Sequence, residues 1–198
     1  TITYYDPVTS VFGALGHGIN DVDTALLMPL EEGTILPATV VGVNKGQAGT
    51  PGQLKGSFDS SGFLGSLQAN TSSGIFGQLE NVNWADGQAV EVAQSSQVHT
   101  GKATILSNIS GDQVEEYEIE IVKIFPDSQQ DGRDYLITVT DQRLLETTGG
   151  IVQGMSGSPI LQDGRFIGAV THVLINDPSC GYGISAQRML SAADKAAQ

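Results

Sequence analysis

The sequence predicts an all-β fold of two barrels of similar size, followed by a short C-terminal helix. Segments rich in Val, Ile, Thr and Tyr are short and alternate with clusters of Gly, Asp, Asn and Ser, as in barrels and sandwiches. The stretch Glu116–Ile121 alternates polar and apolar residues, which is typical of a half-buried strand. The length of 198 residues is enough for one domain or for two fused half-domains.

The individual elements follow from β-branched and aromatic residues for strands and from strong helix formers for helices. Only the range Ser185–Ala197, rich in Ala, Leu, Met, Gln and Lys, predicts a convincing helix. Strands are expected at Thr34–Val43, Val90–Val92, Ala103–Leu106, Glu116–Ile124, Tyr135–Val139, Ile160–Leu161 and Phe166–Val173.

No proline-rich or low-complexity linker divides the chain. We expect one domain over residues 1–198, with the crossing between its halves near Gln94–Gly101. The first barrel then covers about residues 1–97 and contains His17. The second covers about residues 98–198 and contains Ser156.

The composition excludes several classes of partner. The formal net charge of −13 argues against a nucleic-acid backbone or an anionic membrane surface as the main partner. No apolar run approaches the roughly 18 residues that a membrane-spanning helix needs. The single cysteine, Cys180, has no partner for an internal disulfide, and no Cys/His cluster has zinc-site spacing. We therefore expect no metal, no cofactor and no nucleic acid.

The most informative stretch is Gly154–Pro159, which reads Gly-Met-Ser-Gly-Ser-Pro. An attacking serine needs an exposed hydroxyl and backbone N–H groups that converge on the oxyanion. Glycine adopts the backbone angles of such a turn at little cost. The stretch thus predicts Ser156 as a nucleophile, with the N–H groups of Gly154 and Ser156 as the oxyanion hole. The alternative is an ordinary turn between two strands, because the same residue types form those as well.

Three histidines are candidates for the general base. His17 lies among small residues in Ala14–Ile19, which leave its ring accessible. His172 follows Thr171 in a predicted strand, where alternation aims one of the two side chains toward the cleft. His99 lies in a polar stretch, and we expect it at the surface. We rank His17 first, and the geometry has to decide among the three.

The acid that would orient the base is harder to select. Asp141 ends the apolar strand predicted at Tyr135–Val139, where an aspartate often starts a turn or caps a helix. It could equally reach across the barrel to the imidazole of the base. The competing aspartates are Asp21, Asp23, Asp59 and Asp86.

These residues carry a family likeness over essentially the whole chain. The chain resembles the peptidase domain of the sporulation stage IV B proteins, the SpoIVB peptidase family. The most specific match is Thr147–His172, which reads TTGGIVQGMSGSPILQDGRFIGAVTH. The other matching stretches are Ala14–Ile19, Lys45–Leu54, Gly74–Gly77 and Val173–Tyr182.

The resemblance implies two chymotrypsin-like barrels and a serine peptidase. Carried over position by position, it implies His17 as base, Asp141 as acid and Ser156 as nucleophile. It also implies that Thr171 is a further functional residue.

The strand after the nucleophile pairs with an extended substrate in chymotrypsin-like folds. We therefore expect Thr171, His172 and Val173 to bind the substrate.

The resemblance also implies a biological setting. The family carries a membrane segment and a PDZ domain before the peptidase, so we expect both upstream in the full-length protein. The expected location is outside the cytoplasm, in the intermembrane space of the forespore. The expected substrate is a membrane-associated regulatory protein, whose cleavage triggers activation of a late sigma factor, and self-cleavage is expected as well.

Two other functions compete with this interpretation. A protease-like module without activity would hold extended peptides and show the same sequence pattern. An esterase is the third reading, and the lack of βαβ units disfavours the usual esterase fold.

Overall fold

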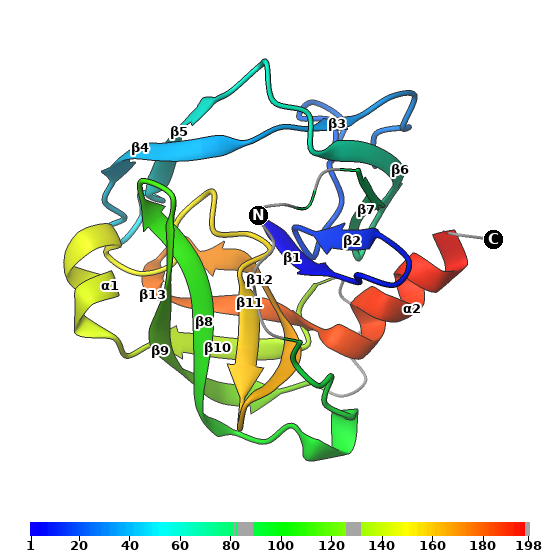
Figure 1. Ribbon diagram of the computed structural model, residues 1–198. Helices are drawn as coiled ribbons and strands as arrows, with labels where there is room; N and C mark the ends of the chain where they lie inside the picture. Colours follow the sequence, from blue (N-terminus) through cyan, green and yellow to red (C-terminus); the bar gives the residue numbers. More distant parts are fainter. Residues whose placement is uncertain (81, 83–88, 126–131, 197–198) are drawn as a thin grey trace.

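The computed structural model describes residues 1–80, 82, 89–125 and 132–196 and is built mainly of β-strands (Figure 1). The first half contains a five-stranded sheet in the order β1-β2-β7-β6-β3 and a separate two-stranded ribbon of β4 and β5. Their bounds are β1 Ile2–Tyr5, β2 Val11–Ala14, β3 Thr34–Ile35, β4 Ala38–Asn44, β5 Gln53–Phe58, β6 Gly65–Thr71 and β7 Gly74–Leu79.

The second half closes into a barrel in the order β10-β13-β12-β11-β8-β9. A 3₁₀ turn, η1 at Ser95–Gln97, precedes the barrel, and helix α1 at Gln142–Thr148 follows its third strand along the chain. The barrel strands are β8 Gly101–Ser110, β9 Gln113–Ile124, β10 Tyr135–Val139, β11 Pro159–Gln162, β12 Arg165–Leu174 and β13 Asp177–Ser185.

The predicted all-β class and the C-terminal helix are confirmed. Helix α2 spans Ala186–Ala196. Only the second half is a closed barrel, however. The first half is an open sheet, and its ribbon of β4 and β5 lies against the second half, through the bridges of Val40 with Gly111 and of Gln53 with Gln153.

Two strand predictions change in detail. The range expected at Thr34–Val43 is divided into β3 and β4, because Pro37 between them has no N–H for a ladder. The range Val90–Val92 forms only an isolated bridge, between Val92 and Phe166.

Helix α1 was not predicted. It has only seven residues, too few for a helical period to stand out in the sequence. Its ends are nevertheless well defined, because Asp141 caps the first turn and Gly149 closes the last in a left-handed conformation.

Three apolar clusters form the core of the protein. The largest fills the barrel around Ile105, Ile119 and Ile137, and a second, around Phe12 and Ile75, lies under the five-stranded sheet. The third joins the two halves through α2 and consists of Phe76, Ala169, Ile184 and Met189.

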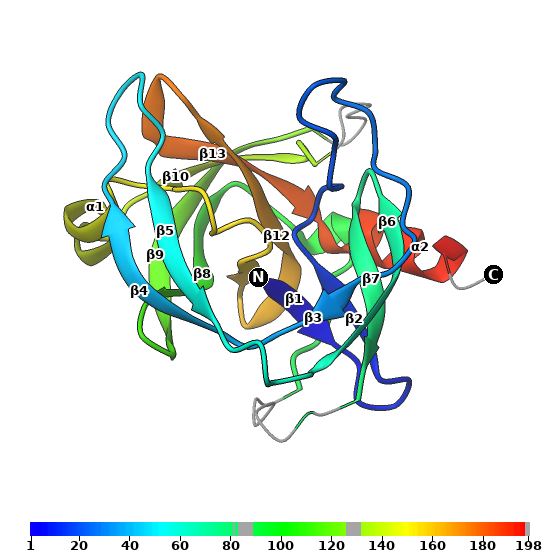
Figure 2. The same cartoon turned by 90° about the horizontal axis from the view of Figure 1, so that it is seen from above.

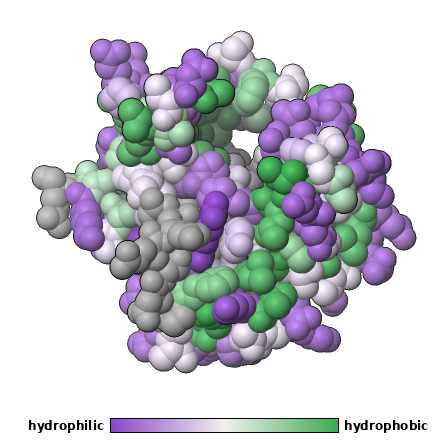
Figure 3. Space-filling model, turned by 180° about the vertical axis from the view of Figure 1, so that it is seen from behind, coloured by the Kyte–Doolittle hydropathy of each residue, from purple (hydrophilic) through white to green (hydrophobic). Residues whose placement is uncertain are grey.

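The start of β1 lies near the middle of the molecule, between the barrel and the rest of its own sheet (Figures 1 and 2). The opposite face combines hydrophilic and hydrophobic areas and is hollowed near its upper edge (Figure 3). In the part of the chain that the structure describes, no helix is both long and apolar enough to cross a membrane.

Candidate active site

Ser156 lies in the turn that leads into β11. Gly154 and Gly157 flank it with φ angles of 102° and 88°, in the left-handed region that glycine tolerates best. Met155 is fully buried in the barrel core and anchors the turn, whereas Ser156 is only half-buried. The local sequence thus presents the hydroxyl at the surface of a fixed turn.

The backbone of this turn leaves two donors unused. The N–H groups of Met155, Gly157 and Ser158 donate to nearby carbonyl oxygens. Those of Gly154 and Ser156 have no acceptor within the described residues. These are the two N–H groups that the sequence pattern assigns to the oxyanion hole, and they are available to a ligand oxygen.

His17 lies in the turn that follows β2. Leu15 and Gly16 before it have φ angles of 67° and 72°, so the chain reverses sharply at this point. The ring Nδ1 of His17 lies 2.9 Å from the carbonyl oxygen of Gly18. Because a carbonyl oxygen only accepts, this contact requires a proton on Nδ1 and leaves Nε2 as the acceptor. That is the tautomer a general base needs.

The serine turn and the histidine turn are in contact. A Cβ built on Gly157 would lie 2.6 Å from the backbone nitrogen of Leu15, so a side chain does not fit there. A Cβ built on Gly16 would lie 2.8 Å from Cγ2 of Thr171. The nucleophile and the base therefore come from different halves of the fold. Gly157 allows their turns to approach, and Gly16 allows the base turn to approach β12.

The hydroxyl of Ser156 donates to the carbonyl oxygen of Thr171 at 3.0 Å. Within the described residues, no hydrogen bond joins Ser156 to His17. The serine side chain must therefore turn away from β12 before the base can take its proton.

His172 lies beside the candidate base. The ring centroids of His17 and His172 are 5.4 Å apart, with 38° between the ring planes. The two rings help to line a cavity of about 270 Å³, whose other residues are Gly18, Asn20, Ala25, Leu27 and Ser72. Burial, together with the charges of His17 and Arg133, lowers the pKa of His172 to about 4, so its imidazole is neutral near pH 7.

Thr171 is buried, and its hydroxyl contacts two backbone carbonyl groups. The carbonyl oxygens of Gly132 and Tyr182 share its single proton, the latter at 3.1 Å. It therefore binds two neighbouring backbone segments. The substrate-binding role expected for Thr171, His172 and Val173 stays a prediction; Val173 packs on the barrel core.

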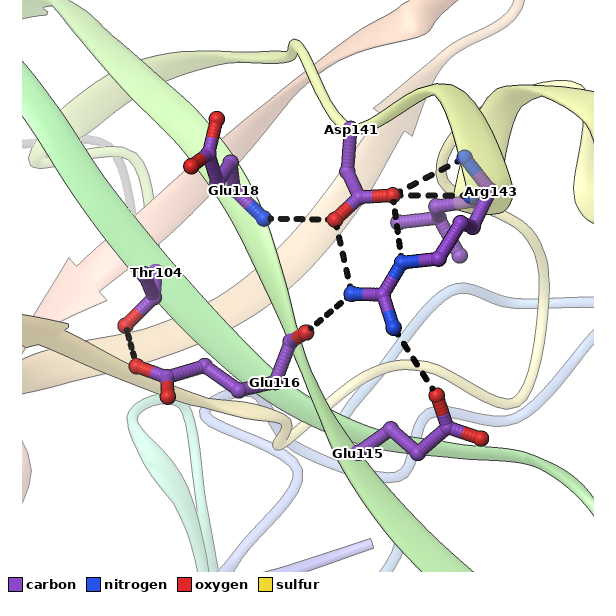
Figure 4. A network of polar contacts seen from close by, with 7 residues as sticks. Thr104, Glu115, Glu116, Glu118, Asp141 and Arg143 are labelled. Atoms are coloured by element: carbon purple, nitrogen blue, oxygen red, sulfur yellow. Dashed lines mark hydrogen bonds and ion pairs between the residues drawn. The ribbon is translucent and has the colours of Figure 1, made fainter.

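Asp141 lies at the N-terminus of α1, where its carboxylate is fully engaged (Figure 4). It accepts from the backbone N–H groups of Arg143, Leu144 and Glu118. The guanidinium of Arg143 donates to both carboxylate oxygens, at 3.2 and 2.9 Å. This guanidinium, more than the backbone donors, holds the pKa of Asp141 below its usual range. These contacts give Asp141 a structural role, and its role as the acid stays a prediction.

The remaining candidates have local partners. Asp21 and Asp59 accept hydrogen bonds within their own turns, from Thr24 and Ser61. Asp23 is exposed, and Asp86 lies outside the described residues. His99 is exposed, with its Nε2 3.0 Å from the carboxylate of Asp163 and its Nδ1 facing the carbonyl oxygen of Thr100. These two contacts raise the pKa of His99, with the Thr100 carbonyl contributing most.

Sequence reasoning missed the residues of the first half that hold the serine turn. The hydroxyl of buried Thr3 donates to the carbonyl oxygen of Gly157 at 2.8 Å, and that of Thr1 to Gly154 at 3.3 Å. The backbone nitrogen of Leu54 donates to Gln153 at 2.8 Å. These contacts join residues about a hundred or more positions apart, so no local pattern in the sequence could indicate them.

In the residues that the structure describes, no group of three or more His, Cys, Asp or Glu side chains is placed to hold a metal ion. Cys180 is a free thiol in β13, half-buried and 3.6 Å from the hydroxyl of Thr138.

The fold and the serine turn, together with the family match over nearly the whole chain, define a serine peptidase. The chain belongs to the SpoIVB peptidase S55 family, whose model matches residues 1–190. Among curated proteins, none matches the sequence.

Solved structures of one serine protease are similar in outline. The inactive form of the Rv3671c protease is 14% identical, with a TM-score of 0.47 over 81% of this chain and 88% of that chain. The active form of Rv3671c from M. tuberculosis is also 14% identical, with a TM-score of 0.45 over 85% of this chain and 92% of that chain.

Proposed function

We propose that this chain is an endopeptidase in which Ser156 attacks the peptide carbonyl and His17 is the general base. One observation carries the assignment: the turn of Ser156 touches the turn of His17 and keeps two backbone donors unpaired beside the serine. A buried or structural serine would have no need of either feature. Both features are expected of a site that performs acyl transfer.

The catalytic cycle begins when Ser156 leaves the carbonyl oxygen of Thr171 and turns toward His17. Nε2 of His17 takes the hydroxyl proton while Oγ forms a bond to the peptide carbon. The N–H groups of Gly154 and Ser156 receive the negative charge that develops on the carbonyl oxygen. His17 then gives its proton to the leaving amine, and water releases the acyl group by the reverse sequence.

The substrate backbone is proposed to lie along β12. The pairing of β11 with β12 ends at Pro159 and Ala169. On that side of β12, the positions from Thr171 to Leu174 have no strand partner in the described part of the chain. An extended peptide would supply the missing antiparallel neighbour. The N–H groups of that peptide would compete with Ser156 for the Thr171 carbonyl, which releases the serine.

The biological setting is proposed from the family. The substrate would be a membrane-associated regulatory protein of the forespore intermembrane space, and its cleavage would lead to activation of a late sigma factor. A PDZ domain and a membrane anchor would accompany the peptidase in the full-length protein, which would also cleave itself. Family membership over residues 1–190 supports this setting.

A comparison of new protein N-termini tests the setting. In a spore-forming bacterium, the resident S55 peptidase is replaced by this chain in full-length form or by its Ser156→Ala variant. We expect the active form to generate new N-termini in a membrane-associated regulatory protein and in itself, followed by late sigma-factor activity. Identical N-termini in both strains would contradict the proposal.

A further inference from the structure

In the part of the chain that the structure describes, no side chain forms a hydrogen bond that orients the base. The carboxylate of Asp141 is committed to Arg143, to the first turn of α1 and to the N–H of Glu118. His17 itself donates from Nδ1 to the carbonyl oxygen of Gly18, next to it in the chain. A turn of the His17 ring toward Ser156 would take that Nδ1–H away from Gly18, and the N–H would then need another acceptor.

His172 carries a ring nitrogen that no other described residue pairs with. Its Nδ1 is fully buried and has no hydrogen-bond partner in the described residues. Buried polar atoms in native proteins are nearly always paired, so an orphan requires an explanation. This orphan belongs to the ring that lies 5.4 Å from the ring of His17, centroid to centroid.

We propose that His172 is the positioning residue of the catalytic base, and that its Nδ1 accepts the Nδ1–H of His17 in the reactive arrangement. The inference rests on the proposed function, in which His17 takes the proton of Ser156. It gives His172 a role in orienting the base, in addition to the substrate contact expected from its place on β12.

The charge state of His172 fits this role. Burial lowers the pKa of the His172 ring most, and the charges of His17 and Arg133 lower it further. His172 therefore stays neutral while His17 becomes an imidazolium, and a neutral imidazole has one nitrogen that accepts. A carboxylate would add charge stabilisation, whereas a neutral ring mainly fixes the orientation and the tautomer.

Three variants separate this role from the alternatives. His172→Phe keeps the ring and removes the acceptor, whereas His172→Gln keeps an acceptor oxygen. Asp141→Asn keeps the helix cap, since Asn caps as well as Asp, but removes the carboxylate. His99→Phe is the matched control at an exposed histidine. The probes are a fluorophosphonate for the nucleophilic serine and a fluorogenic peptide taken from a library for turnover.

We expect His172→Phe to lower the labelling rate and kcat at least about tenfold with KM little changed, and His172→Gln to recover part of the loss. His99→Phe should stay within a few-fold of the wild type, and Asp141→Asn should lose less activity than His172→Phe. If a carboxylate oriented the base, replacing it with an amide would instead lower kcat about 10⁴-fold. The inference is overturned if His172→Phe matches the wild type, if the loss is in KM alone, or if Asp141→Asn loses most of the activity while remaining folded.

A structure of the wild-type protein with a phosphonate on Ser156 gives an independent readout. We expect Nδ1 of His17 within hydrogen-bond distance of Nδ1 of His172. Nδ1 of His17 still on Gly18, or on a carboxylate, would overturn the inference and leave the proposed function standing. If the wild-type serine does not react at all, the proposed function fails together with the inference.

Discussion

The hydroxyl of Thr3 donates a 2.8 Å hydrogen bond to the carbonyl oxygen of Gly157, the residue that follows Ser156. Thr3 belongs to β1 of the five-stranded sheet, whereas Gly157 belongs to the turn that enters the barrel. β1 also pairs with β2, the strand that leads to His17. One short strand thus contacts the nucleophile turn and supports the base turn, which fixes their relative position.

Replacement of Thr3 by valine should reduce catalysis more than it reduces stability. Thr3→Val keeps the shape and removes the donor, so the serine turn loses its attachment to β1. We expect kcat to fall roughly tenfold, since small displacements of catalytic groups are costly, and Thr3→Ser to restore most of it. Thr9→Val removes a surface hydrogen bond to Asp6 and is the control. Equal activities of Thr3→Val and Thr9→Val would contradict this role of Thr3.

Gly157 should tolerate no side chain. At φ 88°, alanine is strained by about 1–2 kcal/mol, and its Cβ would also lie 2.4 Å from the carbonyl oxygen of Thr1. Gly164 has φ 74° but nothing within 4 Å of an added Cβ, so Gly164→Ala isolates the strain. We expect urea unfolding to show a larger destabilisation for Gly157→Ala, and activity to be lost only there. Similar free energies of unfolding for the two variants would mean that the serine turn is not in close contact with the turn that leads to His17.

The stability that Asp141 provides should depend on pH. Its pKa is lower in the folded protein than in the unfolded chain, chiefly because of Arg143. The contribution is therefore present above about pH 4, the usual range for aspartate, and is lost as the pH falls through the lower folded value.

The measurement is urea unfolding of Asp141→Ala at several pH values. At pH 7 we expect a loss of about 1 kcal/mol from the helix cap, with some addition from the lost pairing with Arg143. The difference from the wild type should shrink toward pH 3. Asp23→Ala, at an exposed aspartate, should change little. A difference that is constant between pH 3 and pH 7 would show that the carboxylate charge is unimportant.

Thr171 should act through its hydroxyl on the backbone around it. Thr171→Val leaves the carbonyl oxygens of Gly132 and Tyr182 without their donor, at a cost of about 1–3 kcal/mol for a buried site. Thr171→Ser keeps the donor and should be the milder change in thermal unfolding. If Thr171→Ser is the more damaging variant, the methyl packing against Gly16 is the more important contact.

The local parts of the fold and site could be predicted from the sequence. The strands of the second half have alternating or continuous apolar residues, and the C-terminal helix is rich in strong helix formers. The serine turn has a characteristic glycine pattern, and the structure gives it the strained angles and unpaired donors that this pattern indicates.

The non-local parts could not be predicted. The first sheet stays open because of how its strands pair, which short segments do not reveal. Asp141 shows a related limit. Its partner Arg143 is only two positions away, but the sequence does not reveal in which direction the guanidinium points. His172 shows the converse: its sequence position suggested a cleft residue, but only the folded chain places its ring, which carries a buried unpaired nitrogen, beside the ring of His17.

The most direct test of the account is the reaction of the protein with a fluorophosphonate, followed by mass spectrometry of the labelled peptide. The account predicts a single labelled serine, Ser156, no label in Ser156→Ala, and labelling at least about 10³-fold slower in His17→Ala. Both variants should unfold at the wild-type temperature. A label on another serine, or a His17→Ala variant that reacts as fast as the wild type, would contradict the central claim that these two residues perform the chemistry.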